Sequence, residues 1–132
     1  MVTFDINDYQ KFRELMSASR KQYGPLNRTN LYYMGDTLKN WVEGGLKYFI
    51  TDGGICFLKQ EGNRNRLYYA LNKRVKSIKV QHPNLITEFI CRSEDEKKEN
   101  EAFMHESGFR RKAIYNEMIK MAASSEPNPN GK

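Results

Sequence analysis

The feature of this sequence that most limits its fold is a set of three alternating apolar segments separated by two glycine turns. The segments cover residues 46–51, 55–59 and 66–71, and the steps between them read Asp52-Gly53-Gly54 and Glu61-Gly62-Asn63. Asp-Gly and Gly-Asn steps favour the backbone angles of tight turns, and alternation on both sides of them is typical of antiparallel hairpins. The centre of the chain is therefore predicted to be an antiparallel β-meander.

The sequence before the meander predicts one short strand and two helices. The strand covers residues 2–6, and apolar side chains at helical spacing then follow Asn7, the expected N-cap, to about residue 22. The second helix is expected to begin at Thr29 or Asn30 and to end at the glycine pair just before the meander.

The sequence after the meander predicts a strand, a helix and a strand. Residues 85–91 are nearly continuous in apolar character, which favours a central strand. Ser93 and Glu96 form a capping box, from which a helix is expected to run to the stop at Gly108. A last long strand is predicted over residues 109–121.

These elements predict an α+β domain with a mainly antiparallel sheet of about six strands and three helices. The chain has 132 residues, of which 39% are apolar and 29% charged, so it can bury a core without a disulfide or a metal. One domain is expected over residues 1–121. The remainder, residues 122–132, contains two prolines and repeated asparagines and is expected to be disordered.

The sequence predicts a cytoplasmic protein that does not bind a membrane. Its apolar runs fall short of the about 20 residues that a membrane-spanning helix needs, and the first residues lack the pattern of a signal peptide. Cys56 and Cys91 both lie in predicted strands, where reduced thiols are the expected state in the cytoplasm.

The excess of basic residues is concentrated in one short stretch. The formal net charge is +6, and residues 59–82 carry the whole of this excess. A cluster of this kind either attracts a polyanion, a phosphorylated ligand or an acidic protein surface, or only keeps a hairpin solvated. Its candidate residues for binding an anion or a partner are Arg64, Arg66, Lys73, Arg74, Lys76 and Lys79.

Nucleic acid is the less favoured of these partners. Sheet-type RNA-binding modules stack bases on a row of aromatic side chains. Tyr68 and Tyr69 follow Arg66, but neighbouring residues of a strand point to opposite faces of the sheet. At most one of the two rings could therefore join such a row.

The sequence lacks the spacing that common metal and catalytic sites require. Its cysteines and histidines form no CxxC or HxxxH pattern, so neither a metal nor a catalytic residue is assigned. Glu88 is the one acidic residue of the predicted central strand. It is either a general base or a sheet-face residue paired with a basic side chain such as Arg66, and we favour the pairing.

Three local patterns, taken with the order of elements, resemble the GNAT superfamily of acetyl-CoA-dependent N-acetyltransferases. They are residues 66–71 at the end of a hairpin, 85–90 as a later strand, and the helix end 101–109 with its Gly-Phe step, followed by residues 115–118. The chain is most similar to the degenerate N-terminal module of two-module members. The resemblance covers residues 2–121 and implies a GNAT-like α+β fold.

The cofactor-binding turn of that superfamily has no counterpart in this sequence. The turn reads Gln/Arg-x-x-Gly-x-Gly/Ala and leads into a helix, whereas residues 72–84, which take its place, contain no glycine. The resemblance therefore implies a non-catalytic module without a cofactor, which forms a homodimer or docks on a separate catalytic protein chain. The alternatives are an anion-binding module built on residues 59–82, for nucleic acid or an acidic carrier protein, and an acyltransferase with an atypical site.

Overall fold

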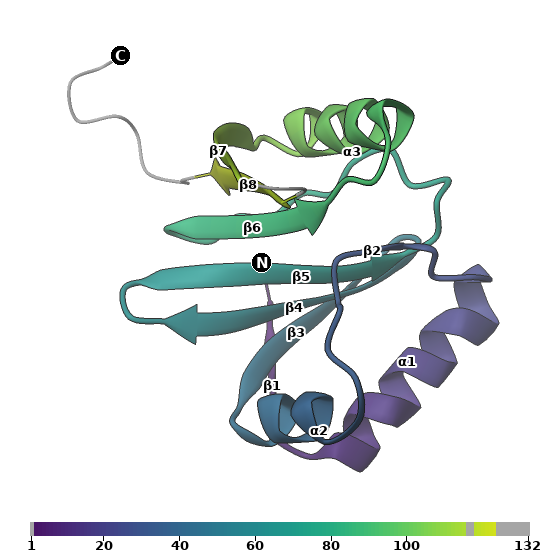
Figure 1. Cartoon of the computed structure of the whole chain (residues 1–132). Coiled ribbons are helices and arrows are strands. Elements are labelled where there is room, and N and C mark those ends of the chain that lie inside the picture. The colour runs from purple at the N-terminus through teal and green to yellow at the C-terminus, as the bar shows by residue number, and fades with distance from the viewer. Residues whose placement is uncertain (1, 116–117, 124–132) are drawn as a thin grey trace. The chain divides into compact units, whose positions relative to one another are not determined.

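The computed structural model describes residues 2–115 and 118–123 and confirms the α+β class. Over these residues the open, mostly antiparallel sheet has eight strands instead of the predicted six (Figure 1). The helices are α1 (Tyr9–Tyr23), α2 (Gly35–Glu43) and α3 (Glu94–Glu106). The strands are β1 (Phe4–Ile6), β2 (Arg28–Thr29), β3 (Leu46–Thr51), β4 (Gly54–Glu61), β5 (Arg64–Leu71), β6 (Leu85–Ile90), β7 (Arg110–Tyr115) and β8 (Met118–Ala123).

The strands follow the order β1-β3-β4-β5-β6-β8-β7, and β2 pairs with β5 outside this order. The chain divides into two compact units. The N-terminal unit consists of Val2–Lys59 and Leu67–Val75, and the C-terminal unit consists of Gln60–Arg66 together with the described residues from Lys76 onward. The expectation of a single domain over residues 1–121 stays a prediction.

Both predicted turns of the meander are present. Thr51 pairs with Gly54 across a two-residue turn in which Gly53 has a φ of 98°. A Cβ atom on Gly54 would stand only 2.2 Å from the carbonyl oxygen of Ala70, so glycine is required there by close packing. The second turn, between β4 and β5, has its positive φ at Gly62.

The core of the N-terminal unit lies between its helices and its strands. The two helices, drawn in purple and blue below the strands in Figure 1, contribute Phe12, Met16 and Val42. These side chains pack against inward-facing residues of β1, β3, β4 and β5, and the rings of Phe12 and Phe57 are 5.0 Å apart. This helix face is the one that the 3.6-residue spacing of the apolar side chains predicts.

Both helices of the N-terminal unit begin later than predicted. The N-cap of α1 is Asp8 instead of Asn7, and its carboxylate accepts a hydrogen bond of 2.9 Å from the backbone N–H of Gln10. The second helix begins at Gly35 instead of at Thr29 or Asn30.

The polar groups of Thr29 and Asn30 bind β5 instead of capping a helix. The Asn30 side chain accepts a bond of 2.7 Å from the backbone N–H of Tyr69 and donates one of 3.1 Å to the carbonyl of Leu67. The Thr29 hydroxyl donates to the Tyr69 carbonyl at 2.8 Å. Because strand β5 uses these groups, the segment becomes the two-residue strand β2 instead of the first turn of a helix.

In the C-terminal unit, the predicted last strand over residues 109–121 is a hairpin of two strands, β7 and β8. A single strand of that length would be longer than most, and folding back lets Ile119 and Met121 become buried. The eighth strand pairs with β6 over six residues, and β6 also pairs in parallel with the start of β5, which confirms the predicted central position of β6. Residues 122 and 123 belong to β8, so the predicted disordered tail was wrong there, and its residues 124–132 lie outside the described residues.

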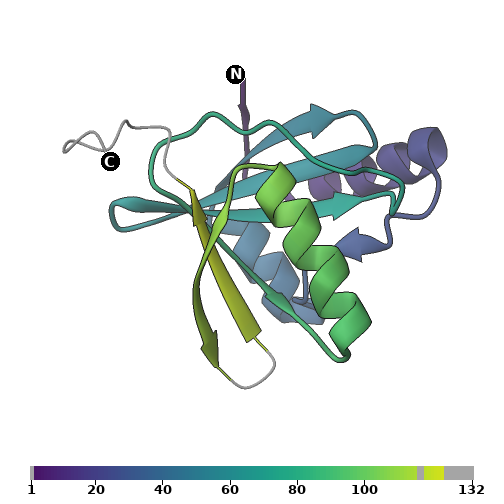
Figure 2. The same cartoon turned by 90° about the horizontal axis from the view of Figure 1, so that it is seen from above.

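Helix α3 begins and ends as its sequence predicts. The Ser93 hydroxyl accepts a bond of 3.1 Å from the Glu96 backbone N–H, and Gly108 follows the helix with a φ of 94°. Phe109 is 1% exposed after this stop. Figure 2 shows the helix, in light green, beside the β7–β8 hairpin. The irregular segment before β6 is attached to the helix end by a bond of 2.9 Å from the Ile78 N–H to the Ser107 hydroxyl.

We predict that Asn30→Ala lowers the free energy of unfolding by about 2–4 kcal/mol, because it leaves buried backbone groups of β5 without their side-chain partner. Urea unfolding followed by circular dichroism measures the change. Asn40→Ala is the control, since Asn40 is exposed on α2 and its side chain makes no hydrogen bond to any described residue. Equal losses in the two variants would contradict the role assigned to Asn30.

Candidate anion-binding site

The structure does not gather the six cationic residues that the sequence singled out into one unit. Lys73 and Arg74 belong to the N-terminal unit. The C-terminal unit holds Arg64, Arg66, Lys76 and Lys79. The predicted cluster of residues 59–82 is therefore not one continuous site within either unit.

Arg66 is neutralised by two carboxylates. Its Nη1 lies 3.0 Å from Glu88 Oε1, and its Nε lies 3.1 Å from Glu61 Oε1. Partial burial lowers the pKa of Arg66, but the hydrogen bonds and charges of Glu88 and Glu61 outweigh this effect and raise that pKa above its usual range. Glu88 is thus the sheet-face partner of Arg66, as the sequence analysis favoured.

The other predicted cations outside the β4–β5 turn take varied positions. Arg74 Nε donates to the side-chain oxygen of Asn72 at 3.1 Å. The backbone N–H of Lys73 donates to the side-chain oxygen of Asn27. This bond holds the backbone and does not involve the Lys73 ammonium group. Lys76 and Lys79 are exposed in the irregular segment before β6. Arg64 differs from these residues because it lines a large hollow in the C-terminal unit.

Arg64 lines a hollow of about 860 Å³ in the C-terminal unit, together with cations of the β7–β8 hairpin. We call this surface the basic hollow and define it by Arg64, Arg110, Lys112 and Lys120. Small residues of the same hairpin, Ala113, Ala122 and Ala123, line the hollow between the cations. No acidic side chain is among the described residues that line it.

The register of the hairpin selects which cations face the basic hollow. Arg110 lies opposite Ala122 of β8, whereas Lys120 lies opposite Ala113 of β7 and, on its other side, opposite Glu88 of β6. Lys112 is the extra residue of a bulge and also lines the hollow. Arg111, between them, instead makes an ion pair of 3.5 Å with Glu101 of α3.

The position of Arg64 is fixed by a network of asparagines. Asn84 has a φ of 55°, and its side chain donates to the Asn63 carbonyl at 3.1 Å. The backbone N–H of Asn65 donates to the Asn84 carbonyl at 3.0 Å. These bonds connect the end of the irregular segment to the β4–β5 turn, so the turn that carries Arg64 is held beside the first residues of β6.

The cations of the basic hollow have few partners within the described part of the chain. The side chains of Arg64, Lys112 and Lys120 make no hydrogen bond or ion pair there. Arg110 donates to a backbone carbonyl, that of Phe109, at 3.1 Å. Four positive charges around one concavity repel each other, and a bound anion would relieve that repulsion.

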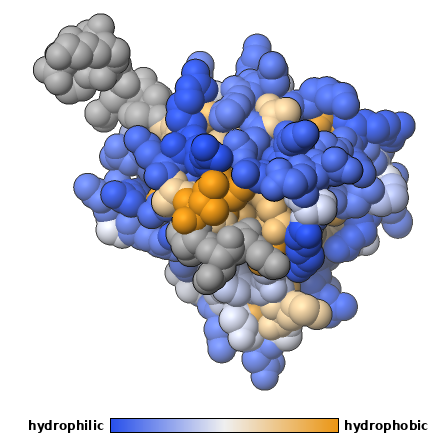
Figure 3. Space-filling view, turned by 45° about the horizontal axis from the view of Figure 1, so that its top comes forward, coloured by the Kyte–Doolittle hydropathy of each residue, from blue (hydrophilic) through white to orange (hydrophobic). Residues whose placement is uncertain are grey.

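A smaller hollow of about 280 Å³ in the same unit lacks this charge selectivity. It is lined by Arg92 and Lys97 but also by Glu94, and by Ile114, which is half exposed. The mixed charges give this smaller hollow no preference for an anion. Figure 3 shows one face of the protein, on which an orange hydrophobic patch lies below hydrophilic, blue side chains.

Sequence reasoning missed Arg110, Lys112 and Lys120 because it summed charge over segments of the chain. The acidic residues of α3 cancel the basic residues of β7 and β8 in such a sum. The run Arg110-Arg111-Lys112 in a predicted strand was the available signal, since alternation places its outer two members on one face of the sheet.

Neither thiol has the properties of a nucleophile. Burial raises the pKa of Cys56 above its usual range. Burial, with the nearby charge of Glu96, also raises the pKa of Cys91. Both side chains therefore stay protonated at neutral pH. No group of three metal-binding side chains lies together among the described residues.

Comparisons with protein-family models, with curated proteins and with solved structures found no match to this chain. None of the described helices is both long enough and apolar enough to cross a membrane.

We predict that Glu88→Gln lowers the free energy of unfolding by about 1–2 kcal/mol, because it removes one charge from a largely buried ion pair. Thermal and urea unfolding measure the change. Asp5→Asn is the control, since the Asp5–Lys47 pair, at 2.8 Å, is slightly shorter than the 3.0 Å Arg66–Glu88 pair but is exposed, and exposed pairs contribute little. A larger loss in the control than in Glu88→Gln would contradict the importance of the Arg66–Glu88 pair.

Proposed function

We propose that this protein is an anion-binding module whose basic hollow holds a phosphorylated small ligand. The observation that carries this proposal is the convergence of Arg64, Arg110, Lys112 and Lys120 on one concave surface without an acidic lining residue in the described chain. Phosphate oxygens are strong hydrogen-bond acceptors, and arginine binds them with a fork of parallel N–H groups. The proposal keeps the anion-binding alternative of the sequence analysis but relocates its site.

The shape and lining of the hollow favour a compact phosphorylated ligand over a nucleic acid. Single-stranded nucleic acid is bound in grooves that combine cations with aromatic side chains for base stacking. The described residues that line the basic hollow include no aromatic side chain. Several phosphate charges close together would match the four cations without stacking.

The position of β7 also favours a ligand over strand-to-strand association. This strand is an edge strand of the sheet, but it carries a bulge and three consecutive cations, Arg110, Arg111 and Lys112. Bulges and charges on an outer strand hinder the addition of another strand. The GNAT relationship, the non-catalytic role and the homodimer or catalytic-chain partner stay predictions of the sequence.

We predict that inorganic tripolyphosphate binds the protein and that Arg110→Gln weakens the binding about tenfold, because one charge-assisted contact is lost. Isothermal titration calorimetry at low salt measures the dissociation constants. The affinity is expected to fall as salt is added, since screening shortens the reach of the four charges. At a ligand concentration of about 100 times the dissociation constant, binding should stabilise the fold by about 2.7 kcal/mol.

Arg111→Gln is the matched control for Arg110→Gln. It removes the same charge from the neighbouring residue, but Arg111 pairs with Glu101 and does not line the hollow. The control should bind tripolyphosphate within about twofold of the unaltered protein. Equal weakening by both variants would show that binding depends on net charge and not on the basic hollow. Tighter binding of single-stranded DNA than of tripolyphosphate would overturn the proposed ligand class.

A further inference from the structure

A second cavity, in the N-terminal unit, combines an apolar floor with unpaired arginines. Its volume is about 690 Å³, within the range of small-molecule sites. Helix α1 supplies Phe12 and Met16, and the segment between the helices supplies Leu26 and Leu31. With Leu38 of α2, the two leucines are partly exposed and pack against the core that contains Phe12 and Met16. The cavity and the basic hollow share no lining residue among the described residues.

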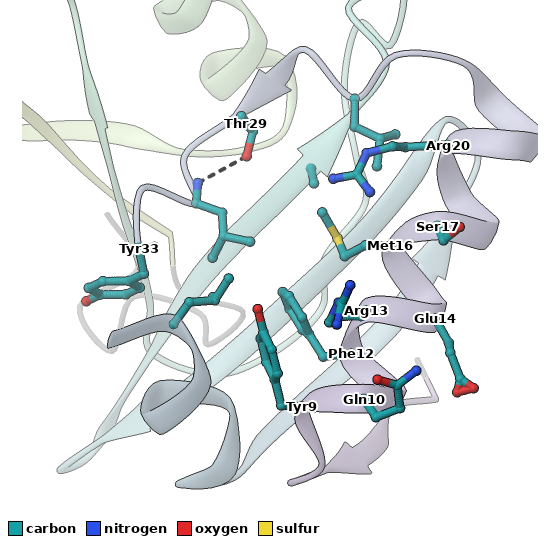
Figure 4. A pocket seen from close by; sticks show the side chains of 14 residues that line it. Tyr9, Gln10, Phe12, Arg13, Glu14, Met16, Ser17, Arg20, Thr29 and Tyr33 are labelled. Carbon is teal, nitrogen blue, oxygen red and sulfur yellow. Dashed lines mark hydrogen bonds between the residues drawn. The ribbon is translucent and has the colours of Figure 1, made fainter. Parts of the chain in front are cut away.

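Two arginines of α1 stand at this cavity. Arg13 and Arg20 are seven residues apart, which places them two turns apart on the same side of the helix. Figure 4 shows the Arg20 side chain reaching from α1 toward the cavity, whereas the Glu14 side chain points away from it. Glu14 is the one acidic residue among the described lining residues.

Neither guanidinium is neutralised within the described chain. Arg20 makes no side-chain hydrogen bond or ion pair there, and Arg13 contacts the ring of Tyr9 at 6.0 Å from its centroid. Hydroxyl groups nearby are partly engaged, since the Thr29 hydroxyl donates to the Tyr69 carbonyl and accepts from the Leu31 N–H. The two arginines are thus the groups best placed to bind a charged atom of a ligand.

We infer that this cavity binds a carboxylate that carries an apolar tail. The carboxylate would accept hydrogen bonds from Arg20, with Arg13 adding positive charge from two turns away. The tail would cover the partly exposed leucines beside the buried Phe12 and Met16, which removes apolar surface from water. Each part of the ligand matches one part of the cavity lining. The arginines favour the negatively charged carboxylate, and the apolar residues favour an aliphatic or aromatic tail.

Trp41 gives a direct readout of this binding. It is the single tryptophan of the chain, and its ring lies 5.2 Å from that of Tyr33, which lines the cavity. A ligand in the cavity should therefore change the tryptophan fluorescence. Octanoate is the probe, with acetate as the tail-free arm and octanol as the charge-free arm, all below micelle-forming concentrations.

We predict a saturable fluorescence change with octanoate and binding about tenfold weaker in Arg20→Gln. Lys21→Gln is the matched control, since Lys21 is the next residue, is exposed, and does not line the cavity. It should bind octanoate as the unaltered protein does, and so should Arg110→Gln, which separates this site from the basic hollow.

Three outcomes would overturn the inference. No saturable change with octanoate would show that the cavity holds no such ligand. Equal binding of octanol and octanoate would remove the role of the arginines, and equal binding of acetate and octanoate would remove the role of the apolar floor. Circular dichroism of each variant shows that its fold is retained.

Discussion

The antiparallel pairing of β8 with β6 determines which face of the C-terminal unit carries charge. The pairing runs over six residues and places Lys120 opposite Glu88. Because strand side chains alternate, a shift of one residue would turn Lys120 to the face that now holds the buried side chains of Ile119 and Met121. Burial of these two side chains therefore fixes the register, and the register fixes the cations that face solvent.

The same pairing explains why neighbouring cations have different roles. Glu88 neutralises Arg66 on β5, whereas Lys120 has a small residue, Ala113, as its neighbour on β7. Glu88 of β6 is thus an acidic neighbour of both Arg66 and Lys120, and no acidic residue stands opposite Lys120 on the β7 side. In the N-terminal unit, the hydrogen bonds of Asn30 likewise decide where a site forms. They hold residues 28–30 against β5, and the cavity lies between this segment and α1.

Local chemistry made part of the fold predictable. The glycine turns of the meander, the Ser93 cap and the stop at Gly108 act over two to four residues, and the sequence shows them directly. The starts of the first two helices were not predictable in this way. The side chains of Thr29 and Asn30 satisfy helix ends and strands equally well, and their partners on β5 lie about forty residues away in the sequence.

The candidate sites were less predictable than the fold, for a related reason. The pairing of Arg66 with Glu88 could be proposed because both lie in predicted strands. The basic hollow depends on a hairpin where one strand is predicted over residues 109–121. Alternation along residues 110–112 could show which of these cations share a face, but the position of Lys120 beside them had no basis in the sequence. The cavity of the N-terminal unit depends on where residues 26–31 pass, which long-range contacts decide.

The bulge in β7 has an evolutionary consequence. Lys112 is an additional residue in its strand, and the pairs on either side of it, Arg111 with Met121 and Ala113 with Lys120, do not depend on its presence. Loss of that one codon would remove a cation while the neighbouring register and the core beneath it persist. A deletion of one residue could thus weaken the attraction of this face for anions without an intermediate sequence that fails to fold.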